Sequence, residues 1–375
     1  MPLLFWGSAV LGLAWIRRQK EFQGDTTLIH LTVLLLGLGT AVQFRLGTWA
    51  TEWSLWRTYL PYAVGVGALL FTAKYFNESR LATTTSRLTW IFWGLAIIPL
   101  IALLLFGEKY RGGTFLPGKI NPSELTKVFL ILFSASWLPK HLTGLSRTLL
   151  GLPMPPLKEL LLLGFTWGVP LLLTILVGDF GMVLILSITL MVLLTAMTHR
   201  WGWLIFGSIF TCGAGWLVQN FSAHTHVRFS IWLDPFADPD GKGYQIGQSL
   251  CAQYAGNLWG TGIAQGHPTQ IPIVESDFVY AAIAEEWGLV GCGLLLLIYS
   301  LWLHCIASTT SKNLLSQTLS KGIAALLGVQ ILLNIAGVTK ALPMTGITLP
   351  FFSLGGFSLM AVLFLSGLAI ANTKH

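Results

Sequence analysis

Residues 88–106 read LTWIFWGLAIIPLIALLLF, a run without a single charged side chain. An α-helix needs about 20 apolar residues to cross roughly 30 Å of hydrocarbon, so this run predicts a membrane-spanning helix. The whole chain has the same character, because 54% of its 375 residues are hydrophobic, only 10% are charged, and the mean hydropathy is +0.70. One soluble core could not bury so much apolar surface, and the sequence therefore predicts an all-α polytopic membrane protein.

Other apolar runs are as long as residues 88–106, or nearly so. They cover residues 3–16, 27–46, 58–73, 125–139, 159–178, 180–198, 201–219, 278–307, 322–342 and 356–372. Together these runs predict about eleven helices. The first run lacks a charged leading region and an obvious small-residue cleavage site, which favours an uncleaved helix over a signal peptide.

The positions of lysine and arginine predict the orientation of these helices, because cytoplasmic loops carry an excess of both. If the loop after the first helix is cytoplasmic, that side holds 13 of the 22 basic residues and four acids. The opposite side then holds nine bases and nine acids, and it includes the long loop 220–276. The net charge of +7 follows from this topology and gives no reason to expect nucleic acid as a partner.

Segment 228–286 interrupts the apolar pattern. It reads RFSIWLDPFADPDGKGYQIGQSLCAQYAGNLWGTGIAQGHPTQIPIVESDFVYAAIAEE and holds seven of the 15 acids. Carboxylates held at a membrane surface are costly and usually serve an activity. For Asp238 and Asp240, simple solvation of acids in a long loop is as good an explanation as a functional role. Asp277 differs, because it lies where the loop returns to apolar sequence. Glu285 and Glu286 follow Asp277 by about two helical turns, deeper in the predicted helix, and either a structural ion pair or a function fits them.

Two of three further polar islands on the same predicted side contain acids. In residues 111–127, RGGTFLPGKINPSELTK, Asn121 is expected to cap a helix that has Pro122 in its first turn. Glu124 and Lys127 then share one helical face, where they form either a local ion pair or part of a site. In residues 178–181, GDFG, an N-cap would explain Asp179 without any function.

The third island, residues 340–358, reads KALPMTGITLPFFSLGGFS, and its prolines and glycines break the helical pattern. Irregular backbone at membrane depth persists only where protein or a water-filled cavity surrounds it. Each island has a structural explanation, but four polar segments on one face predict a cleft. The four cysteines have no metal-binding spacing and are expected to be free thiols. No Walker loop or dinucleotide fingerprint occurs, so no nucleotide cofactor is expected.

The polar segments also carry a family resemblance. In chain order they are NPSELTK, GDFG, RFSIWLDPFADPDGKGYQIGQSL, IPIVESDFVYAAIAEEWGLVG and LPMTGITLPFFSLGG. They resemble the SEDS family (shape, elongation, division and sporulation) of RodA- and FtsW-like peptidoglycan glycosyltransferases, and the resemblance covers residues 25–371. It implies about ten transmembrane helices within a glycosyltransferase domain, residues 25–375. Residues 1–24 would add an N-terminal transmembrane helix and a basic cytoplasmic loop.

The resemblance assigns roles to particular residues. The family's serine-glutamate motif and its following lysine match Ser123, Glu124 and Lys127, with Asn121 in place of the usual glutamine. The family's proline-aspartate turn keeps its aspartate, Asp179, and loses its proline.

The aspartate regarded as catalytic in the family matches Asp277, which follows Ser276. Residues 272–275 read PIVE where the family has proline, glutamate, alanine and histidine, so no role carries over for that glutamate or histidine. Thr345 and Ser353, from the last motif, are assigned to substrate binding or to support of the site.

The implied reaction is polymerisation of lipid II, in which a sugar hydroxyl displaces a pyrophosphate-linked lipid with inversion. Asp277 would take the hydroxyl proton, and partial burial would raise its pKa toward a useful range. The leaving group requires positive charge, from a divalent cation such as Mg²⁺ or Mn²⁺ or from basic side chains. The basic residues on the correct predicted side include Arg228, Lys242, Lys127, Arg111 and Lys340.

By resemblance, the protein works on the outer face of the bacterial cytoplasmic (inner) membrane, with a class B penicillin-binding protein, a monofunctional transpeptidase, as its partner. Two other functions stay open. A lipid II flippase would also need a polar cleft, although transporters place essential charges near the bilayer midplane and often contain repeated halves, which this sequence lacks. A non-catalytic scaffold for the transpeptidase would tolerate replacement of Asp277.

Overall fold

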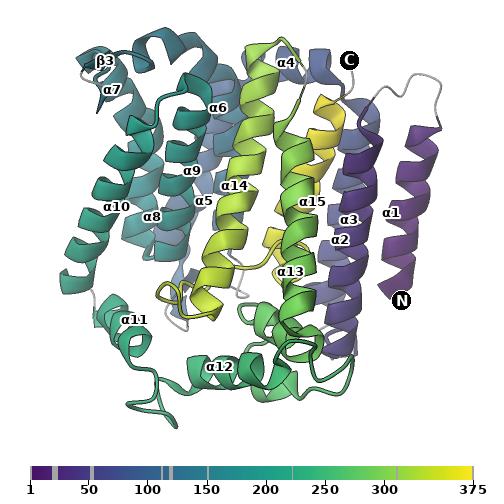
Figure 1. The fold of residues 1–375 in the computed structure, drawn as a ribbon. Coiled ribbons are helices and arrows are strands. Elements are labelled where there is room, and N and C mark those ends of the chain that lie inside the picture. Colours follow the sequence, from purple (N-terminus) through teal and green to yellow (C-terminus); the bar gives the residue numbers. More distant parts are fainter. Residues whose placement is uncertain are drawn as a thin grey trace. The chain divides into compact units, whose positions relative to one another are not determined.

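The computed structural model describes residues 2–18, 24–50, 55–110, 113–117, 121–149, 152–221, 223–309 and 311–373. Its α-helices, shown in Figure 1, are α1 (Pro2–Arg17), α2 (Thr26–Arg45), α3 (Leu60–Tyr75), α4 (Glu78–Arg87), α5 (Thr89–Phe106), α6 (Ser123–Leu145), α7 (Leu157–Leu163), α8 (Val169–Val177), α9 (Phe180–Thr198), α10 (Gly202–Phe221), α11 (Ala223–Leu233), α12 (Tyr244–Gly256), α13 (Val279–Ala307), α14 (Leu314–Val338) and α15 (Gly356–Asn372). Two π-helical segments, Leu55–Tyr59 and Gly164–Gly168, and one 3₁₀ turn, Pro268–Gln270, complete the helical elements of the described residues.

The predicted class, an all-α polytopic membrane protein, is confirmed. By length and composition, seven helical segments within the described residues can cross a membrane: Thr26–Arg45, Thr89–Phe106, Ser123–Leu145, Leu157–Val177, Phe180–Thr198, Val279–Ala307 and Leu314–Val338. Two shorter apolar helices, α1 and α15, also coincide with predicted runs. In the part of the chain that the structure describes, strands occur in two small antiparallel hairpins, β1 (Glu108–Tyr110) with β2 (Gly113–Phe115), and β3 (Thr148–Leu149) with β4 (Leu152–Pro153).

The prediction for residues 322–342 is wrong at both ends, because α14 begins and ends earlier. Its start is capped by Asn313, whose Oδ1 accepts a hydrogen bond of 3.0 Å from the Leu315 N–H. This cap allows the polar turn before residue 322 to be helical. Beyond the helix end, Lys340 has a left-handed φ of 61°, which an α-helix cannot continue through.

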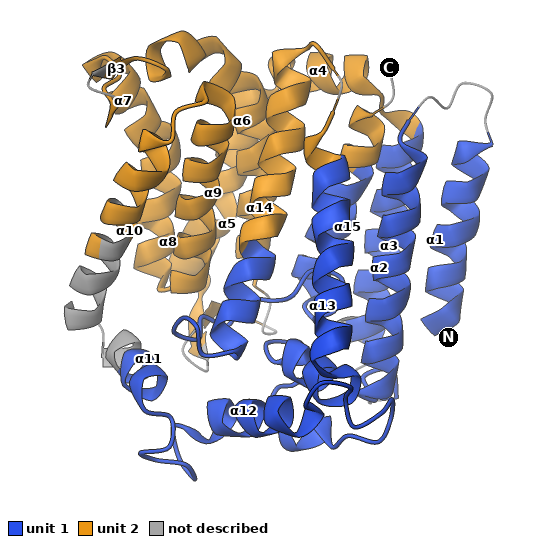
Figure 2. Ribbon diagram, in the orientation of Figure 1, with its two compact units in different colours: residues 1–74, 218–305, 330–367 blue, residues 75–217, 306–329, 368–375 orange. Residues whose placement is uncertain are grey.

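Two compact units make up the chain, and Figure 2 colours them separately. Unit 1 comprises Met1–Lys74, Val218–Cys305 and Gln330–Gly367, and unit 2 comprises Tyr75–Leu217, Ile306–Val329 and Leu368–His375. Unit 2 contains an apolar core cluster built on α6 and α9. Phe133 and Trp137 from α6 and Leu186 and Leu193 from α9 are buried in it, together with Trp167 from the π-helical segment before α8.

In unit 1, the irregular segment 340–355 is held by side chains, as the sequence predicts for non-helical backbone at membrane depth. Each of its carbonyl groups that lacks a helical partner would cost free energy if it were buried without a hydrogen bond. Four of these carbonyls accept hydrogen bonds from polar side chains of the surrounding helices. The donor and acceptor residues are Gln43 and Phe352, Tyr299 and Pro350, Gln330 and Thr348, and Asn334 and Ile347.

The predicted span 278–307 is interrupted, because α13 contains a break at Gly288 (φ 67°, ψ −172°). Such a break leaves helical N–H and C=O groups without their usual partners. Backbone of residues 257–262 supplies replacements: the Leu289 N–H donates to the Asn257 carbonyl at 3.0 Å, and the Thr261 N–H donates to the Glu285 carbonyl at 2.9 Å. A Cβ at position 288 would lie 2.2 Å from the Gly260 nitrogen, so only glycine fits this close approach.

Candidate active site

Asp277 lies in the turn that leads into α13, in unit 1. The Ser276 hydroxyl donates a hydrogen bond of 2.9 Å to Oδ1 of Asp277. The other carboxylate oxygen, Oδ2, lies beside Gly346, where a Cβ would be 3.6 Å away. Segment 340–355 therefore lies against the carboxyl group of Asp277. The apolar residues that flank this segment in the sequence give no sign of that contact.

The backbone around Asp277 is held in place by hydrogen bonds to three consecutive carbonyl groups. Those of Glu275, Ser276 and Asp277 all accept hydrogen bonds from other parts of unit 1. The donors are the Gln43 side chain (2.8 Å) and the Leu354 N–H (2.7 Å) for Glu275, the Ser353 hydroxyl for Ser276, and the Asn334 side chain (3.1 Å) for Asp277. These contacts orient the carboxylate in advance of any reaction, which is how catalytic groups gain efficiency.

Ser353, which the sequence assigns to the site, contacts the turn and not the carboxylate. Its Oγ donates to the Ser276 carbonyl and accepts the Leu349 N–H at 2.7 Å. Both roles of the hydroxyl are thereby used in positioning the backbone. Asn334 and Gln43 hold the same turn through its carbonyl groups, although no sequence motif pointed to either residue. The signal that could have found them is an amide side chain within an otherwise apolar helix.

The electrostatic surroundings of Asp277 act in both directions on its pKa. The residue as a whole is half-buried, but its carboxyl group is closely surrounded by protein atoms. Burial of this group is the largest influence on its pKa, and it raises the pKa. The Ser276 hydrogen bond and the Arg228 charge lower this pKa, and the Glu275 charge raises it. The balance is a raised pKa, as the sequence predicts for a base.

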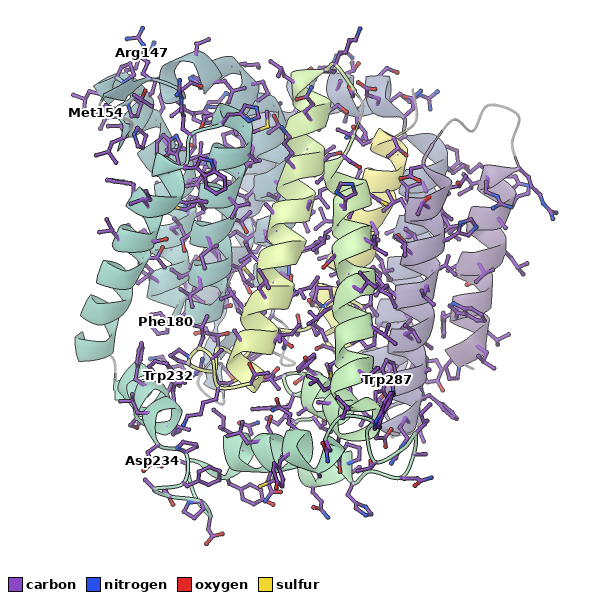
Figure 3. The ribbon with its side chains drawn as sticks, in the orientation of Figure 1. Arg147, Met154, Phe180, Trp232, Asp234 and Trp287 are labelled. Carbon is purple, nitrogen blue, oxygen red and sulfur yellow. The ribbon has the colours of Figure 1, made fainter. Side chains whose placement is uncertain are left out.

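Arg228 is held near this carboxylate because α11 forms hydrogen bonds with segment 340–355. Its Nη1 donates to the Met344 carbonyl at 3.4 Å, next to the half-buried Thr345. Nearby, the Trp232 indole, labelled in Figure 3, donates to the Lys340 carbonyl at 3.0 Å. The structure therefore brings Arg228 and Thr345 to the same segment that covers Asp277.

Lys242 is placed differently. It lies in an exposed turn where its own N–H donates to Oδ2 of Asp238 at 3.0 Å. Among the described residues, no contact joins the Lys242 side chain to Asp277 or Arg228. Its role toward the leaving group stays a prediction, and Arg111 lies outside the described residues.

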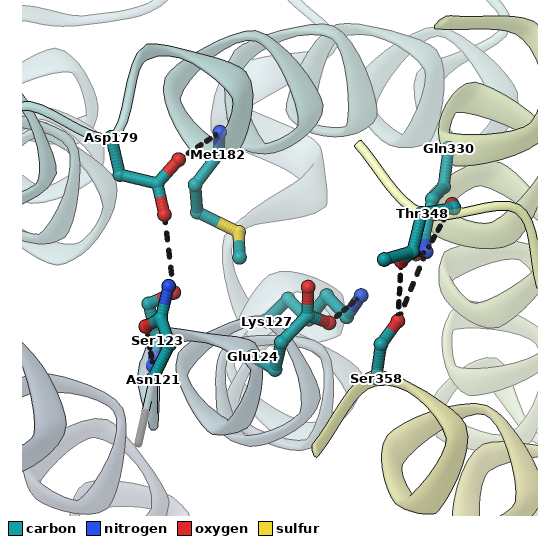
Figure 4. Close-up of polar contacts among 9 residues, drawn as sticks. All are labelled: Asn121, Ser123, Glu124, Lys127, Asp179, Met182, Gln330, Thr348 and Ser358. Carbon is teal, nitrogen blue, oxygen red and sulfur yellow. Dashed lines mark hydrogen bonds and ion pairs between the residues drawn. The ribbon is translucent and has the colours of Figure 1, made fainter. Parts of the chain in front are cut away.

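A second polar cluster belongs to unit 2, at the start of α6 (Figure 4). Glu124 and Lys127 form the ion pair that their spacing predicts, with the lysine side chain 0% exposed and the glutamate 18% exposed. The predicted cap is off by one residue, because α6 begins at Ser123 and its N-cap residue is Pro122, not Asn121. The Asn121 Oδ1 accepts the Ser123 N–H at 3.0 Å, so this side chain stabilises the turn that leads into the helix.

Asp179 caps α9, which confirms the structural explanation offered for it. Its Oδ1 accepts the Met182 N–H at 3.1 Å. Its Oδ2 accepts the Ser123 hydroxyl at 3.2 Å, so the same carboxylate also ties the start of α9 to the start of α6 (Figure 4). In this arrangement Asp179 supports the position of the Glu124–Lys127 pair.

Glu285 and Glu286 have structural partners in unit 1. Glu286 pairs with Arg45 at 2.9 Å, and Glu285 accepts the His267 N–H at 2.8 Å. Both acids are buried about two turns into α13, as predicted, just before the break at Gly288. Their backbone carbonyls accept the N–H groups of Thr261 and Gly262, which attaches segment 257–267 to the helix.

The fold and the site together define a polytopic membrane protein with a preorganised, partly buried carboxylate beside an arginine. The chain belongs to the FtsW, RodA and SpoVE family of cell cycle proteins, whose family model matches residues 27–375. This is the SEDS family that the motifs resemble.

Curated relatives support the same assignment. The peptidoglycan glycosyltransferase RodA of Mycobacterium tuberculosis is 32% identical, over 96% of this chain and 79% of its own length. The probable peptidoglycan glycosyltransferase FtsW of Coxiella burnetii is 31% identical, over 88% and 82%. Stage V sporulation protein E of Bacillus subtilis is 28% identical, over 95% and 98%.

Solved structures share the fold. A chain from a peptidoglycan synthase complex, described as coordinating polymerization and crosslinking, matches with a TM-score of 0.72 and 25% identity, over 94% of this chain and 98% of that one. The rod shape determining protein RodA of Thermus thermophilus matches with a TM-score of 0.66 and 23% identity, over 94% and 97%, which shows the fold alone.

Proposed function

We propose that this protein polymerises lipid II into glycan strands, with Asp277 as the general base. The chain is a peptidoglycan glycosyltransferase, the activity for which its curated relatives are named. The observation that carries the proposal is the fixed Asp277 carboxylate, with a raised pKa and an arginine beside it.

In the proposed step, the 4-hydroxyl of N-acetylglucosamine in one substrate attacks C1 of N-acetylmuramic acid in another. Asp277 accepts the hydroxyl proton as the new C–O bond forms. The bond from C1 to the lipid-linked pyrophosphate breaks on the opposite face, with inversion, and undecaprenyl pyrophosphate leaves with the electron pair. The raised pKa suits the carboxylate to this work, because a stronger base takes a hydroxyl proton more readily.

Arg228 can stabilise negative charge as the pyrophosphate departs, because preorganised cations act strongly at a site that excludes water. The described residues contain no group of three or more His, Cys, Asp and Glu that could hold a metal ion. A divalent cation such as Mg²⁺ or Mn²⁺ at this site stays a prediction.

The protein is a multi-pass membrane protein. We place it in the bacterial cytoplasmic membrane with its active site on the outer face, on the charge distribution of the loops. The synthase complex that contains a similar chain supports a transpeptidase, a class B penicillin-binding protein, as its partner.

The acid limb of the pH–activity profile should move in opposite directions when the two charges near Asp277 are removed. Asp277 works deprotonated, so activity falls as the pH drops through its pKa. Arg228→Met removes a charge that lowers this pKa and should move the limb to higher pH, whereas Glu275→Gln should move it to lower pH. The measurement is kcat/KM for polymerisation against pH, normalised for each variant.

Arg18→Met is the control for this pair, because it removes an exposed cation from the same unit that has no assigned role in the site. Its profile should coincide with that of the unchanged protein. If both variants kept the original midpoint, or both moved the same way, Asp277 would not be the group that limits activity in acid.

The proposed orientation predicts opposite labelling of two loops in intact cells. Single cysteines at Asp240 and Lys312, both exposed, would be introduced in a background without the native cysteines. Lys312 is preferred over its neighbour Asn313, whose amide caps α14. A membrane-impermeant thiol reagent should react at position 240 and not at position 312. The reverse pattern would place Asp277 in the cytoplasm and end the proposal.

A further inference from the structure

A pocket in unit 2 is lined by none of the residues assigned to polymerisation. It has a volume of about 350 Å³ and is formed where α4 meets α5 and where α6 approaches its end. Figure 1 shows α4, α7 and β3 at the same end of this unit. By the charge distribution of the loops, this end is predicted to be cytoplasmic.

The lining of the pocket carries positive charge. Arg87, the last residue of α4, and Lys140, on α6, both line it and are exposed. No carboxylate is among the lining residues. The nearby acid Glu159 is already engaged, because its Oε2 contacts Nδ1 of His141 at 2.7 Å. An anion of one or two charges therefore has two cations available to it.

Aromatic rings form the walls. Trp137, which is 4% exposed, stacks on His141 with ring centroids 4.4 Å apart and an interplanar angle of 21°. Trp90 is 56% exposed and packs against Phe133, with ring centroids 5.7 Å apart. Tryptophan prefers the boundary between lipid headgroups and acyl chains, so these rings place the pocket at headgroup level.

The pocket is continuous with the apolar surface of α5. Ile91 lines it and is 56% exposed, and Ile98 and Leu105 continue the exposed apolar surface along the same helix. α5 is one of the segments that can span the membrane, so its exposed apolar side chains face acyl chains. A ligand that fits these surroundings has a charged head and an apolar tail.

We propose that this pocket binds the headgroup of an anionic phospholipid. The phosphodiester lies between Arg87 and Lys140, the headgroup packs on the exposed ring of Trp90, and the acyl chains run along α5. Basic pockets between transmembrane helices on the cytoplasmic side are suited to such headgroups. The site is independent of Asp277 and of the polymerisation chemistry.

Native mass spectrometry of the purified full-length protein tests this site. The protein would be titrated with phosphatidylglycerol and, separately, with phosphatidylcholine of the same acyl chains. Phosphatidylglycerol should bind more tightly. Arg87→Gln and Lys140→Gln should each weaken its binding about fivefold, as expected for loss of one cation near a membrane surface.

Arg147→Gln is the matched control, since Arg147 is exposed and, as Figure 3 shows, lies near Met154 outside the pocket lining. It should bind phosphatidylglycerol as the unchanged protein does. The melting temperature of each variant would confirm folding, which exposed substitutions leave intact. Equal loss in all three variants would overturn the proposal. Full competition by inorganic phosphate alone would also overturn it, in favour of a soluble phosphate ligand.

Discussion

Asp277→Asn should reduce the rate of polymerisation by about a hundredfold to ten-thousandfold, the usual contribution of a positioned general base. Asparagine keeps the volume of the side chain, and its Oδ1 can still accept the Ser276 hydrogen bond. The Asp277 carbonyl, which Asn334 holds, is also unaffected. The substitution therefore removes the proton acceptor alone. The measurement is the initial rate of lipid II consumption at equal concentrations of folded protein.

Asp240→Asn is the control for this variant. Asp240 is an exposed acid of the same unit, in the turn that precedes α12, and its replacement should leave the rate unchanged. A well-folded Asp277→Asn protein with the original rate would remove Asp277 from the mechanism. That result would favour the flippase or the scaffold.

Lys127→Met and Glu124→Gln should each lower both the polymerisation rate and the melting temperature, and together they should cost less than the sum. Each single change leaves one charge of a buried pair without its partner, and breaking such a pair typically costs about 3–5 kcal/mol. The double variant leaves neither charge uncompensated, so part of the loss should return. Melting curves and initial rates of the four proteins form the double-mutant cycle.

Lys109→Met supplies the comparison for this cycle, because Lys109 is an exposed lysine of the same unit. It should change neither quantity, since surface charges contribute little. Additive effects of the Glu124 and Lys127 substitutions would show that the two side chains act separately.

Sequence alone predicts those features that depend on local pattern. Hydropathy locates most spans to within a few residues, because each span needs only its own apolar length. The Glu124–Lys127 pair follows from helical spacing, and the cap of α9 by Asp179 follows from its position before an apolar run. Motif order led to Asp277 and Arg228, which unit 1 brings together.

Features that depend on distant segments could not be predicted in this way. Asn334 lies within an apolar helix, and its partners, the carbonyls of Asp277 and Ile347, become known only when three segments fold together. The break at Gly288 lies in a continuous apolar run, and it is stabilised by backbone about 30 residues earlier in the chain. The sequence assigned Ser353 to substrate binding or to support of the site, and only the folded structure shows that its hydroxyl holds the turn at Ser276.

Incubation of the purified full-length protein with lipid II, without any nucleotide, tests directly whether this chain is a polymerase. The products would be separated by length on a gel, for the protein alone and with the proposed partner, a class B penicillin-binding protein. We expect glycan strands and released undecaprenyl pyrophosphate, both lost in Asp277→Asn. Lipid II that stays monomeric under both conditions, while the protein moves it between the leaflets of a vesicle, would show a flippase and not a polymerase.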